Sequence, residues 1–155
     1  MEGVSGFAVR DGADRFGSPT FFLNGRFDCK VSGQETEGRL CIIDTVRTHQ
    51  GGPPLHLHHE QEEWFFVREG EFLFQVGTDV VRLKAGDSIL APRGVPHTFA
   101  NVTDAARLMI VFQPAGTIEE FFRQGSLLDQ ATREDFIELH RRHGMEVVGP
   151  PLKLG

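Results

Sequence analysis

Cysteine, basic stretches and long apolar runs are scarce in this chain, and each scarcity excludes a class of protein. The two cysteines, Cys29 and Cys41, lie in apolar segments, which predicts buried free thiols in a reducing compartment rather than a disulfide framework. The net charge is −6 and no segment is rich in Lys or Arg, so we expect no nucleic-acid partner. Apolar runs are too short to span a membrane and residues 1–14 lack a signal-type apolar core, so we expect a cytoplasmic protein without a membrane partner.

Phenylalanine and glycine, by contrast, are abundant. The 155 residues suffice for one domain with a real core, and they include 14 Phe but one Trp and no Tyr. Many aromatic rings together with 18 glycines favour a compact β architecture with many tight turns. No internal repeat or low-complexity segment interrupts the chain.

Short strands at regular spacing predict a closed or nearly closed sandwich-like barrel over residues 20–114. Residues 1–19 are expected to form an irregular lead-in, and Asn24-Gly25 is a strong signal for a hairpin turn. The predicted strands cover residues 20–23, 26–31, 39–49, 64–67, a hairpin at 71–83 that turns at 77–79, 88–91, 97–101 and, as the last strand, 107–113.

Two helices are predicted in the remaining segment, residues 115–155, which we expect to pack on the barrel. The first begins at Thr117, with Glu120 completing a capping box, and ends at Gly125. The second begins at Thr132, with Asp135 three residues later, and ends at Gly144. Residues 145–155 contain Gly-Pro-Pro and are expected to be extended.

A pair of histidines two residues apart begins the most informative stretch. On a strand, His56 and His58 point to the same face. Glu63 opens the apolar run that follows, and a carboxylate at the head of a buried strand needs a partner. A metal ion held by the two imidazoles would supply that partner. A third imidazole, His97, arrives on a corner shaped by Pro and Gly residues, which suits a preorganised ligand.

These residues resemble the two motifs of the cupin superfamily. The first motif is matched at His56, His58, Glu63 and Gly70, although its leading glycine, Gly51 or Gly52, lies slightly too close to His56. The second motif is matched at Gly86, Pro92, Gly94, His97 and Asn101. The resemblance implies an all-β cupin fold, that is, a double-stranded β-helix or jelly-roll barrel, here with short C-terminal helices. It also implies one metal ion held by His56, His58, Glu63 and His97.

Other ionisable residues nearby fit the motif less well. Glu62 is the alternative carboxylate, but the spacing to Gly70 and the strand register favour Glu63, so Glu62 is expected to be solvated. His59 is expected in a loop. The remaining histidines are expected at the surface or at helix caps: His49, His140 and His143.

Three imidazoles and a carboxylate suit a divalent transition metal, namely Fe, Mn, Ni, Co, Zn or Cu. Such a set leaves positions open for a small-molecule substrate, and Glu63 is a candidate general base. Three rings, Phe65, Phe74 and Phe99, are expected to make the mouth of the site apolar, which favours a planar or aromatic ligand.

The segments around both motifs are similar to small bacterial proteins of quercetin-2,3-dioxygenase type. That resemblance implies O₂-dependent cleavage of a flavonol or related enol, with Glu63 as the catalytic base. A metal-dependent isomerase or lyase acting on a sugar-derived or keto-enol substrate is an alternative, and so is a non-catalytic small-molecule-binding protein.

Trp64 and Phe66 alternate with the inward residues of their strand and should therefore point outwards. Adjacent exposed aromatic rings usually mark an interface, so we expect a homodimer. The alternative is that the C-terminal helices cover these two rings within one chain.

Overall fold

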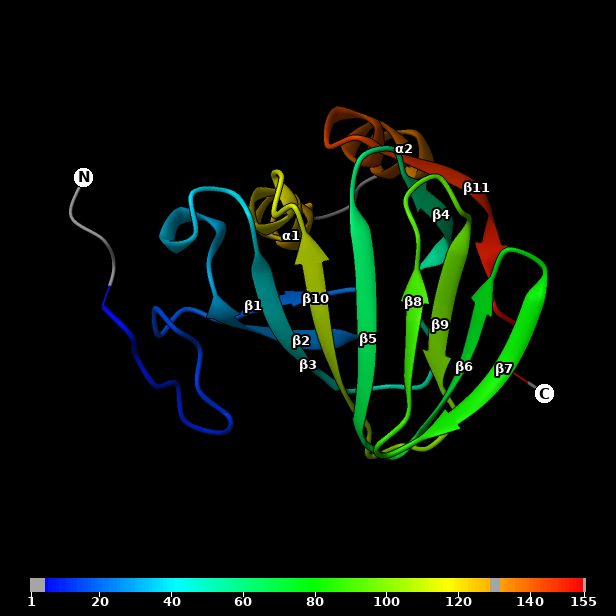
Figure 1. Ribbon diagram of the computed structural model, residues 1–155. Helices are drawn as coiled ribbons and strands as arrows, with labels where there is room; N and C mark the ends of the chain where they lie inside the picture. The colour runs from blue at the N-terminus through cyan, green and yellow to red at the C-terminus, as the bar shows by residue number, and fades with distance from the viewer. Residues whose placement is uncertain (1–4, 129–131, 155) are drawn as a thin grey trace.

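The computed structural model describes residues 5–128 and 132–154, which form two antiparallel sheets packed face to face (Figure 1). In sheet order, the six-stranded sheet contains β1 (Thr20–Phe22), β2 (Gly25–Val31), β3 (Cys41–Arg47), β10 (Arg107–Gln113), β5 (Glu62–Glu69) and β8 (Ser88–Ala91). The five-stranded sheet contains β11 (Met145–Pro151), β4 (Pro54–His58), β9 (His97–Asn101), β6 (Glu71–Val76) and β7 (Asp79–Lys84). A short 3-10 helix (Gly33–Glu35) follows β2.

The predicted all-β jelly-roll architecture is confirmed, and of the two predicted forms, closed or nearly closed, the closed one is wrong. Within the described residues, no ladder of hydrogen bonds joins the two sheets, so each sheet keeps two edge strands. Helices α1 (Ile118–Ser126) and α2 (Arg133–Arg142) lie at one end of the sandwich, where α1 packs on β1 and α2 on β11 (Figure 1). The helices therefore cover the end that a closed barrel would leave open.

Phenylalanine side chains fill the space between the sheets. Alternate residues of each strand point inwards, which buries Phe65 on β5, Phe72 and Phe74 on β6, Phe99 on β9 and Phe112 on β10. Each such ring stabilises the fold by about 1.5–3 kcal/mol relative to leaving it exposed. The high phenylalanine content thus serves mainly the core.

The first hairpin turns one residue earlier than predicted. Phe22 pairs with Gly25, so Leu23 and Asn24 form the two-residue loop, and both have positive φ. Gly25 belongs instead to β2, where a Cβ atom would lie 2.5 Å from the guanidinium of Arg47. The glycine is required for this close packing rather than for the turn.

The helix boundaries follow the prediction for α2 and depart from it for α1. Thr132 and Asp135 form the expected capping box. Thr117 does not cap α1 with its side chain, because its hydroxyl hydrogen-bonds Nδ1 of His143 at 2.7 Å. Gly125 lies inside the last turn of α1, where its missing Cβ lets the ring of Phe22 approach.

The prediction that 107–113 is the last strand is also wrong, because β11 follows both helices. This strand pairs with β4, placing Met145 opposite His58 and Val147 opposite His56. Its Gly-Pro-Pro ending obscured it in the sequence, but β11 is an edge strand, where proline is tolerated. Part of the segment predicted as a helical extension thus belongs to the sheet that carries the histidine pair.

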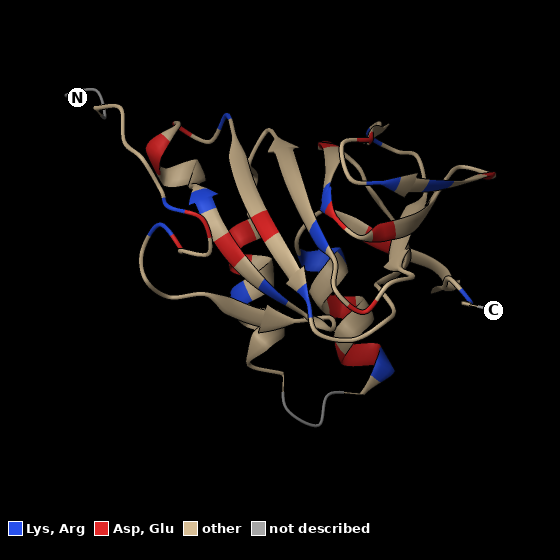
Figure 2. Ribbon diagram, turned by 90° about the horizontal axis from the view of Figure 1, so that it is seen from below, with Lys and Arg blue, Asp and Glu red and all other residues tan. Residues whose placement is uncertain are grey.

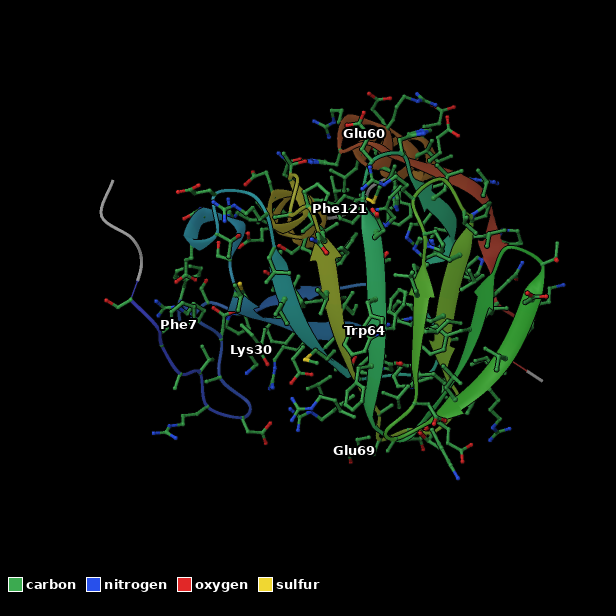
Figure 3. The ribbon with its side chains drawn as sticks, in the orientation of Figure 1. Phe7, Lys30, Glu60, Trp64, Glu69 and Phe121 are labelled. Carbon is green, nitrogen blue, oxygen red and sulfur yellow. The ribbon has the colours of Figure 1, made fainter. Side chains whose placement is uncertain are left out.

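The outer face of the six-stranded sheet combines ion pairs with apolar side chains. Asp44, which is buried, accepts hydrogen bonds from Arg68 (2.8 Å) and Arg107 (2.7 Å), and acidic and basic segments lie on neighbouring strands (Figure 2). The rings of Trp64 and Phe66 stack at 5.8 Å on the same face. Trp64 lies away from both helices (Figure 3), so the alternative that the helices cover these rings is wrong.

Two further expectations concern the thiols and membrane spanning. Cys41 is buried and Cys29 half-buried, and both are free thiols, as predicted. None of the helices among the described residues combines the length and the apolar character needed to cross a membrane.

Candidate metal centre

The structure brings His56, His58, Glu63 and His97 together between the two sheets. Each side chain is at least nine-tenths buried, and one potential ligand atom from each lies within 4.8 Å of all the others. The Glu63 Oε2 atom lies 2.8 Å from Nε2 of His97 and 3.0 Å from Nε2 of His58. Two ligands at about 2.1 Å from one ion lie at most about 4 Å apart, so the two distances from Glu63 fit a shared ion, and the widest spacing in the cluster needs only a small shift of the side chains.

Pairing between strands from distant parts of the chain produces this convergence. β4 supplies His56 and His58, and β9 pairs with it so that His97 lies opposite His56. Gly52, just before β4, permits this approach, because a Cβ atom there would lie 1.7 Å from the backbone oxygen of Phe99. Gly52 is therefore needed to seat the segment that leads into β4 against β9.

Each of the three imidazole rings is oriented by a hydrogen bond from its Nδ1. The partner atom is in each case an oxygen that accepts hydrogen bonds and cannot donate them, so Nδ1 carries the hydrogen. The acceptors are the carbonyl oxygen of Pro54 for His56 (2.8 Å), Oε1 of Gln61 for His58 (2.7 Å) and the carbonyl oxygen of Val95 for His97 (3.0 Å). Gln61 is itself fixed, since its Nε2 donates to the carbonyl oxygens of Pro114 and Ala115. With Nδ1 protonated in each ring, Nε2 is left to face the centre, as in metal-ligating histidines.

Glu63 and His97 form a buried ion pair at this centre. Burial alone would raise the pKa of Glu63, but the charges of the neighbouring imidazoles and the hydrogen bond from His97 hold that pKa well below its usual range. Burial lowers the pKa of His97, but the charge and hydrogen bond of Glu63 outweigh it and raise that pKa above the ordinary value. The pKa of His56 is lowered by burial and by repulsion from His97 and His58.

One buried nitrogen at the centre has no protein partner. Nε2 of His58 makes no acceptable hydrogen bond among the described residues, although Glu63 lies nearby. A buried polar atom without a partner is costly in free energy, and a bound ion would satisfy it. The donor set and its geometry therefore fit a metal ion.

A cavity of about 30 Å³ adjoins the cluster, and five phenylalanine rings line part of its wall. These rings come from β2, β9, β10 and α1, namely Phe27, Phe99, Phe112, Phe121 and Phe122. We refer to this cavity as the inner chamber. Of the three rings expected at the mouth, only Phe99 lines it, whereas Phe65 and Phe74 lie deeper in the core.

Two functional candidates in the inner chamber were not predicted. His140, expected at the surface or at a cap, is 1% exposed; it lies 5.9 Å from the ring of His56, centroid to centroid, and hydrogen-bonds the carbonyl of Phe136 through Nδ1. Burial lowers its pKa. Arg47, at the end of β3, also lines the chamber; burial lowers its pKa to about 10, and its Nε has no partner among the described residues.

The other ionisable residues lie outside the cluster. Glu62 pairs with Arg93 at 2.6 Å on the surface. His59 is exposed in the loop after β4, and His49 is exposed after β3. His143 is half-buried at the C-terminal cap of α2.

The fold and the metal-type cluster are those of a cupin, and comparison with known proteins agrees. Residues 43–112 match the family model described as a cupin domain. The chain thus contains a cupin domain, as its two motifs predicted. A solved RmlC-like cupin from Shewanella frigidimarina superposes with a TM-score of 0.60 at 20% identity, covering 74% of this chain and 96% of that one.

Two curated relatives match shorter segments. One is an uncharacterized protein, SCO3923, from Streptomyces coelicolor, which is 32% identical over 56 residues, or 36% of this chain and 53% of that protein. The other is the oxidoreductase iacF from Pestalotiopsis fici, which is 40% identical over 55 residues, or 35% of this chain and 27% of that protein. The matched segment thus spans about half or less of each relative.

Proposed function

We propose that this cupin binds one divalent transition metal ion (Fe, Mn, Ni, Co, Zn or Cu) at His56, His58, Glu63 and His97 and is a metal-dependent dioxygenase for a flavonol-like or other enol substrate. The observation that carries the proposal is the set of three imidazoles whose Nδ1 protons are held by fixed acceptors, which leaves Nε2 of each ring for an ion beside the buried carboxylate of Glu63. A bound ion would supply Lewis acidity and, if redox-active, a route for O₂ chemistry.

The residues of the chain would hold the substrate and its proton. Glu63 Oε2 already accepts a hydrogen bond from His97 and is the candidate acceptor for an enol proton. Arg47, with its unpartnered Nε, would attract the anionic oxygen that remains. The phenylalanine rings that line the inner chamber make the surroundings of the ion apolar, which favours the reactive end of a planar or aromatic molecule.

The relative named as an oxidoreductase supports redox chemistry, although only a part of that protein is matched. Metal analysis of protein purified without added metal, followed by oxygen-uptake assays on flavonols and other enols, tests the proposal. We expect one equivalent of metal, and oxygen uptake that disappears in His97→Ala. Metal-loaded protein without oxygen uptake on any enol would eliminate the dioxygenase.

A metal-dependent isomerase or lyase acting on a sugar-derived or keto-enol substrate is the second candidate. The buried carboxylate of Glu63 supports it, because a proton acceptor beside the ion in a closed site suits proton transfer without O₂. Product formation under argon would favour this reaction over the first. Ligand affinity that survives in metal-free His97→Ala, without turnover by the wild type, would indicate a non-catalytic binding protein.

We further propose a cytoplasmic homodimer formed through the outer face of the six-stranded sheet. The stacked rings of Trp64 and Phe66 support the dimer together with Leu90, which is paired with Trp64 and 50% exposed. The two free thiols support a reducing compartment. In sedimentation at micromolar concentration, Trp64→Glu should convert a dimer to a monomer, whereas Val80→Glu on the other sheet should not. A monomeric wild type would contradict the dimer.

A further inference from the structure

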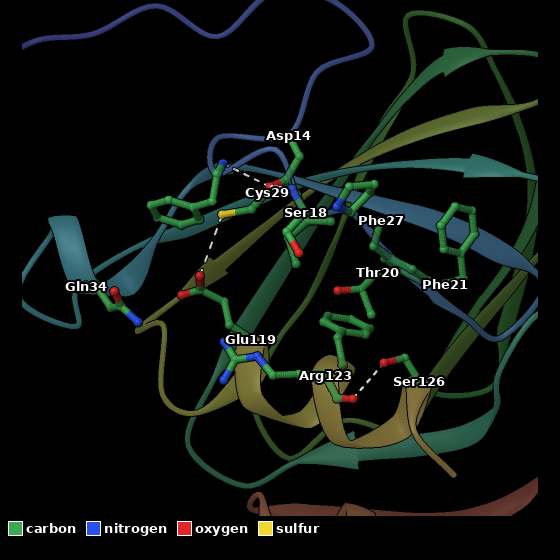
Figure 4. A pocket seen from close by; sticks show the side chains of 14 residues that line it. Asp14, Ser18, Thr20, Phe21, Phe27, Cys29, Gln34, Glu119, Arg123 and Ser126 are labelled. Carbon is green, nitrogen blue, oxygen red and sulfur yellow. Dashed lines mark hydrogen bonds between the residues drawn. The ribbon is translucent and has the colours of Figure 1, made fainter. Parts of the chain in front are cut away.

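The inner chamber is too small for an organic substrate. Its volume of about 30 Å³ has room for one or two water molecules, whereas ligand sites usually measure about 300–1,000 Å³. A second, outer cavity of about 570 Å³ lies between β2, α1 and the segment before β1 (Figure 4). Only this larger volume, of the two, can hold the body of a flavonol-sized molecule.

Two phenylalanine rings separate the inner chamber from the outer cavity. Phe27 on β2 and Phe122 on α1 line both volumes. Their rings stack at 4.5 Å, with 27° between the planes, and both residues are buried. Because Phe122 is carried by a short helix at the end of the sandwich, a rotation of its ring or a small shift of α1 would connect the two volumes.

The outer cavity has aromatic walls and an exposed cationic group. Phe16 and Phe21 are 55% and 61% exposed at its rim, which is unusual for rings without a ligand or partner. Arg123 points into the cavity from α1 (Figure 4), paired with Glu120 but more than half exposed. Thr20 adds a hydroxyl without a hydrogen-bond partner among the described residues.

The acidic residues of the outer cavity are already engaged in holding the protein together. Both oxygens of Asp14 accept backbone N–H groups, including that of Cys29 at 2.6 Å. Glu119 accepts from the Ser32 hydroxyl at 3.1 Å and from the Gly33 N–H at 2.8 Å. The available groups are thus aromatic faces, hydroxyls and a guanidinium, which suit a planar aromatic molecule that is neutral or anionic.

A third cavity, of about 490 Å³, touches the cluster at His58, but Gln61 blocks access to the centre from there. It is lined by polar side chains such as Glu60 and by His58. There, His58 is approached from its Nδ1 edge, which Gln61 blocks with a 2.7 Å hydrogen bond while donating to two backbone carbonyls. A ligand in this cavity would face the back of the imidazole and not its Nε2.

We propose that the outer cavity is the binding site for the body of the substrate, a planar aromatic enol or carboxylate, and that its reactive oxygen reaches the inner chamber between Phe27 and Phe122. This inference rests on the proposed function, since it assumes that a metal ion occupies the cluster. It assigns specificity to residues of β1, α1 and the N-terminal segment, outside the two cupin motifs.

Removal of Fe²⁺ by 1,10-phenanthroline, a planar aromatic chelator, tests this route. Protein loaded with Fe²⁺ under anaerobic conditions is mixed with increasing concentrations of phenanthroline, and the rate of Fe²⁺ removal is measured. The quantity compared between variants is the component of this rate that increases with chelator concentration. Thr20→Trp, which fills the outer cavity, should lower that rate about tenfold, whereas Glu60→Trp, which fills the third cavity, should leave it unchanged. Phe122→Ala should raise it about tenfold, whereas the matched core variant Phe72→Ala should not.

The outcomes separate this inference from the proposed function. If the protein retains Fe²⁺ but Glu60→Trp slows the chelator while Thr20→Trp does not, the route is wrong and the metal centre stands. A wild-type rate independent of chelator concentration would equally overturn the route. If the protein takes up neither Fe²⁺ nor another divalent ion, the proposed function fails and the inference fails with it. If Phe122→Ala does not fold, the pair of tryptophan variants still decides the question.

Discussion

Metal binding to the metal-free protein should release a proton, and His97 is its source. Both nitrogens of this ring donate, Nδ1 to the Val95 carbonyl at 3.0 Å and Nε2 to Glu63 at 2.8 Å, so the ring is an imidazolium. To become a ligand, Nε2 must lose its proton. His56 already carries a single proton on Nδ1, since burial lowers its pKa, so it has none to release.

The size of the effect follows from the direction of the pKa shift. The pKa of His97 is raised above 6.5, mainly by Glu63 acting against burial, so more than half of the molecules carry this proton at pH 6.5. At that pH, His97 should therefore release more than half a proton and at most one. Below the raised pKa, affinity should increase up to tenfold per pH unit, or about 1.4 kcal/mol, and it should level off above that pKa.

Calorimetric titration of the metal in two buffers of different ionisation enthalpy, both at pH 6.5, measures this release. In Glu63→Gln, the carboxylate charge is lost while burial remains, so the pKa of His97 should fall and the release should drop below half a proton. This variant also lacks one ligand, so its weaker affinity must be measured separately by competition. Release of less than half a proton by the wild type, or of two, would refute the protonation states deduced from the hydrogen bonds.

Three further predictions follow from buried groups. Burial lowers the pKa values of His56 and His140, so below pH 6.5 the unfolded chain binds more protons than the folded protein. As the pH is lowered in that range, each histidine should reduce the free energy of unfolding of the metal-free protein by up to about 1.4 kcal/mol per pH unit. His140→Phe should therefore reduce the slope of stability against pH measured by urea unfolding. Gln61→Leu should weaken metal affinity about 10–100-fold in chelator competition, whereas Gln50→Leu should not. Gly52→Ala should destabilise the protein by roughly 1–3 kcal/mol or more in the same urea assay.

Each of these predictions can fail separately. If the free energy of unfolding falls with the same slope at low pH in His140→Phe as in the wild type, this imidazole is protonated in the folded protein. Equal metal affinities for the Gln61 and Gln50 variants would mean that the orientation of His58 does not depend on its Nδ1 partner. A fully stable Gly52→Ala would contradict the close approach to the Phe99 carbonyl, and Gly6→Ala, with no atoms nearby, serves as its control.

Local sequence signals predicted most of the strands because burial alternates along them. The strand at 88–91 and the one at 107–113 have the predicted bounds, and the two motifs brought four candidate ligands to one place. What failed depended on tertiary packing. The turn at Leu23–Asn24, the glycine inside α1 and the edge strand β11 are set by contacts with other elements, which no local pattern records.

The same reason explains why His140 and Arg47 were missed. His140 follows Phe136 by four residues and adjoins Leu139, so it shares the apolar face of α2, and this was the available signal. Whether that face meets the cluster or the solvent depends on how α2 packs beside β11, which lies after it in the chain. Arg47 lacks even that signal, because it ends a strand whose burial changes at its last residues.

The pairing of β4 with β11 has a consequence for synthesis. β4, with two of the candidate ligands, is complete early in the chain, yet its ladder partner comes almost last, at Met145–Pro151. During synthesis, the edge of β4 that pairs with β11 stays unpaired while about ninety more residues are added. Contacts between segments so far apart in the chain form late. The newly made chain should therefore acquire its ion only after the segment containing β11 has emerged, in whichever compartment that final step takes place.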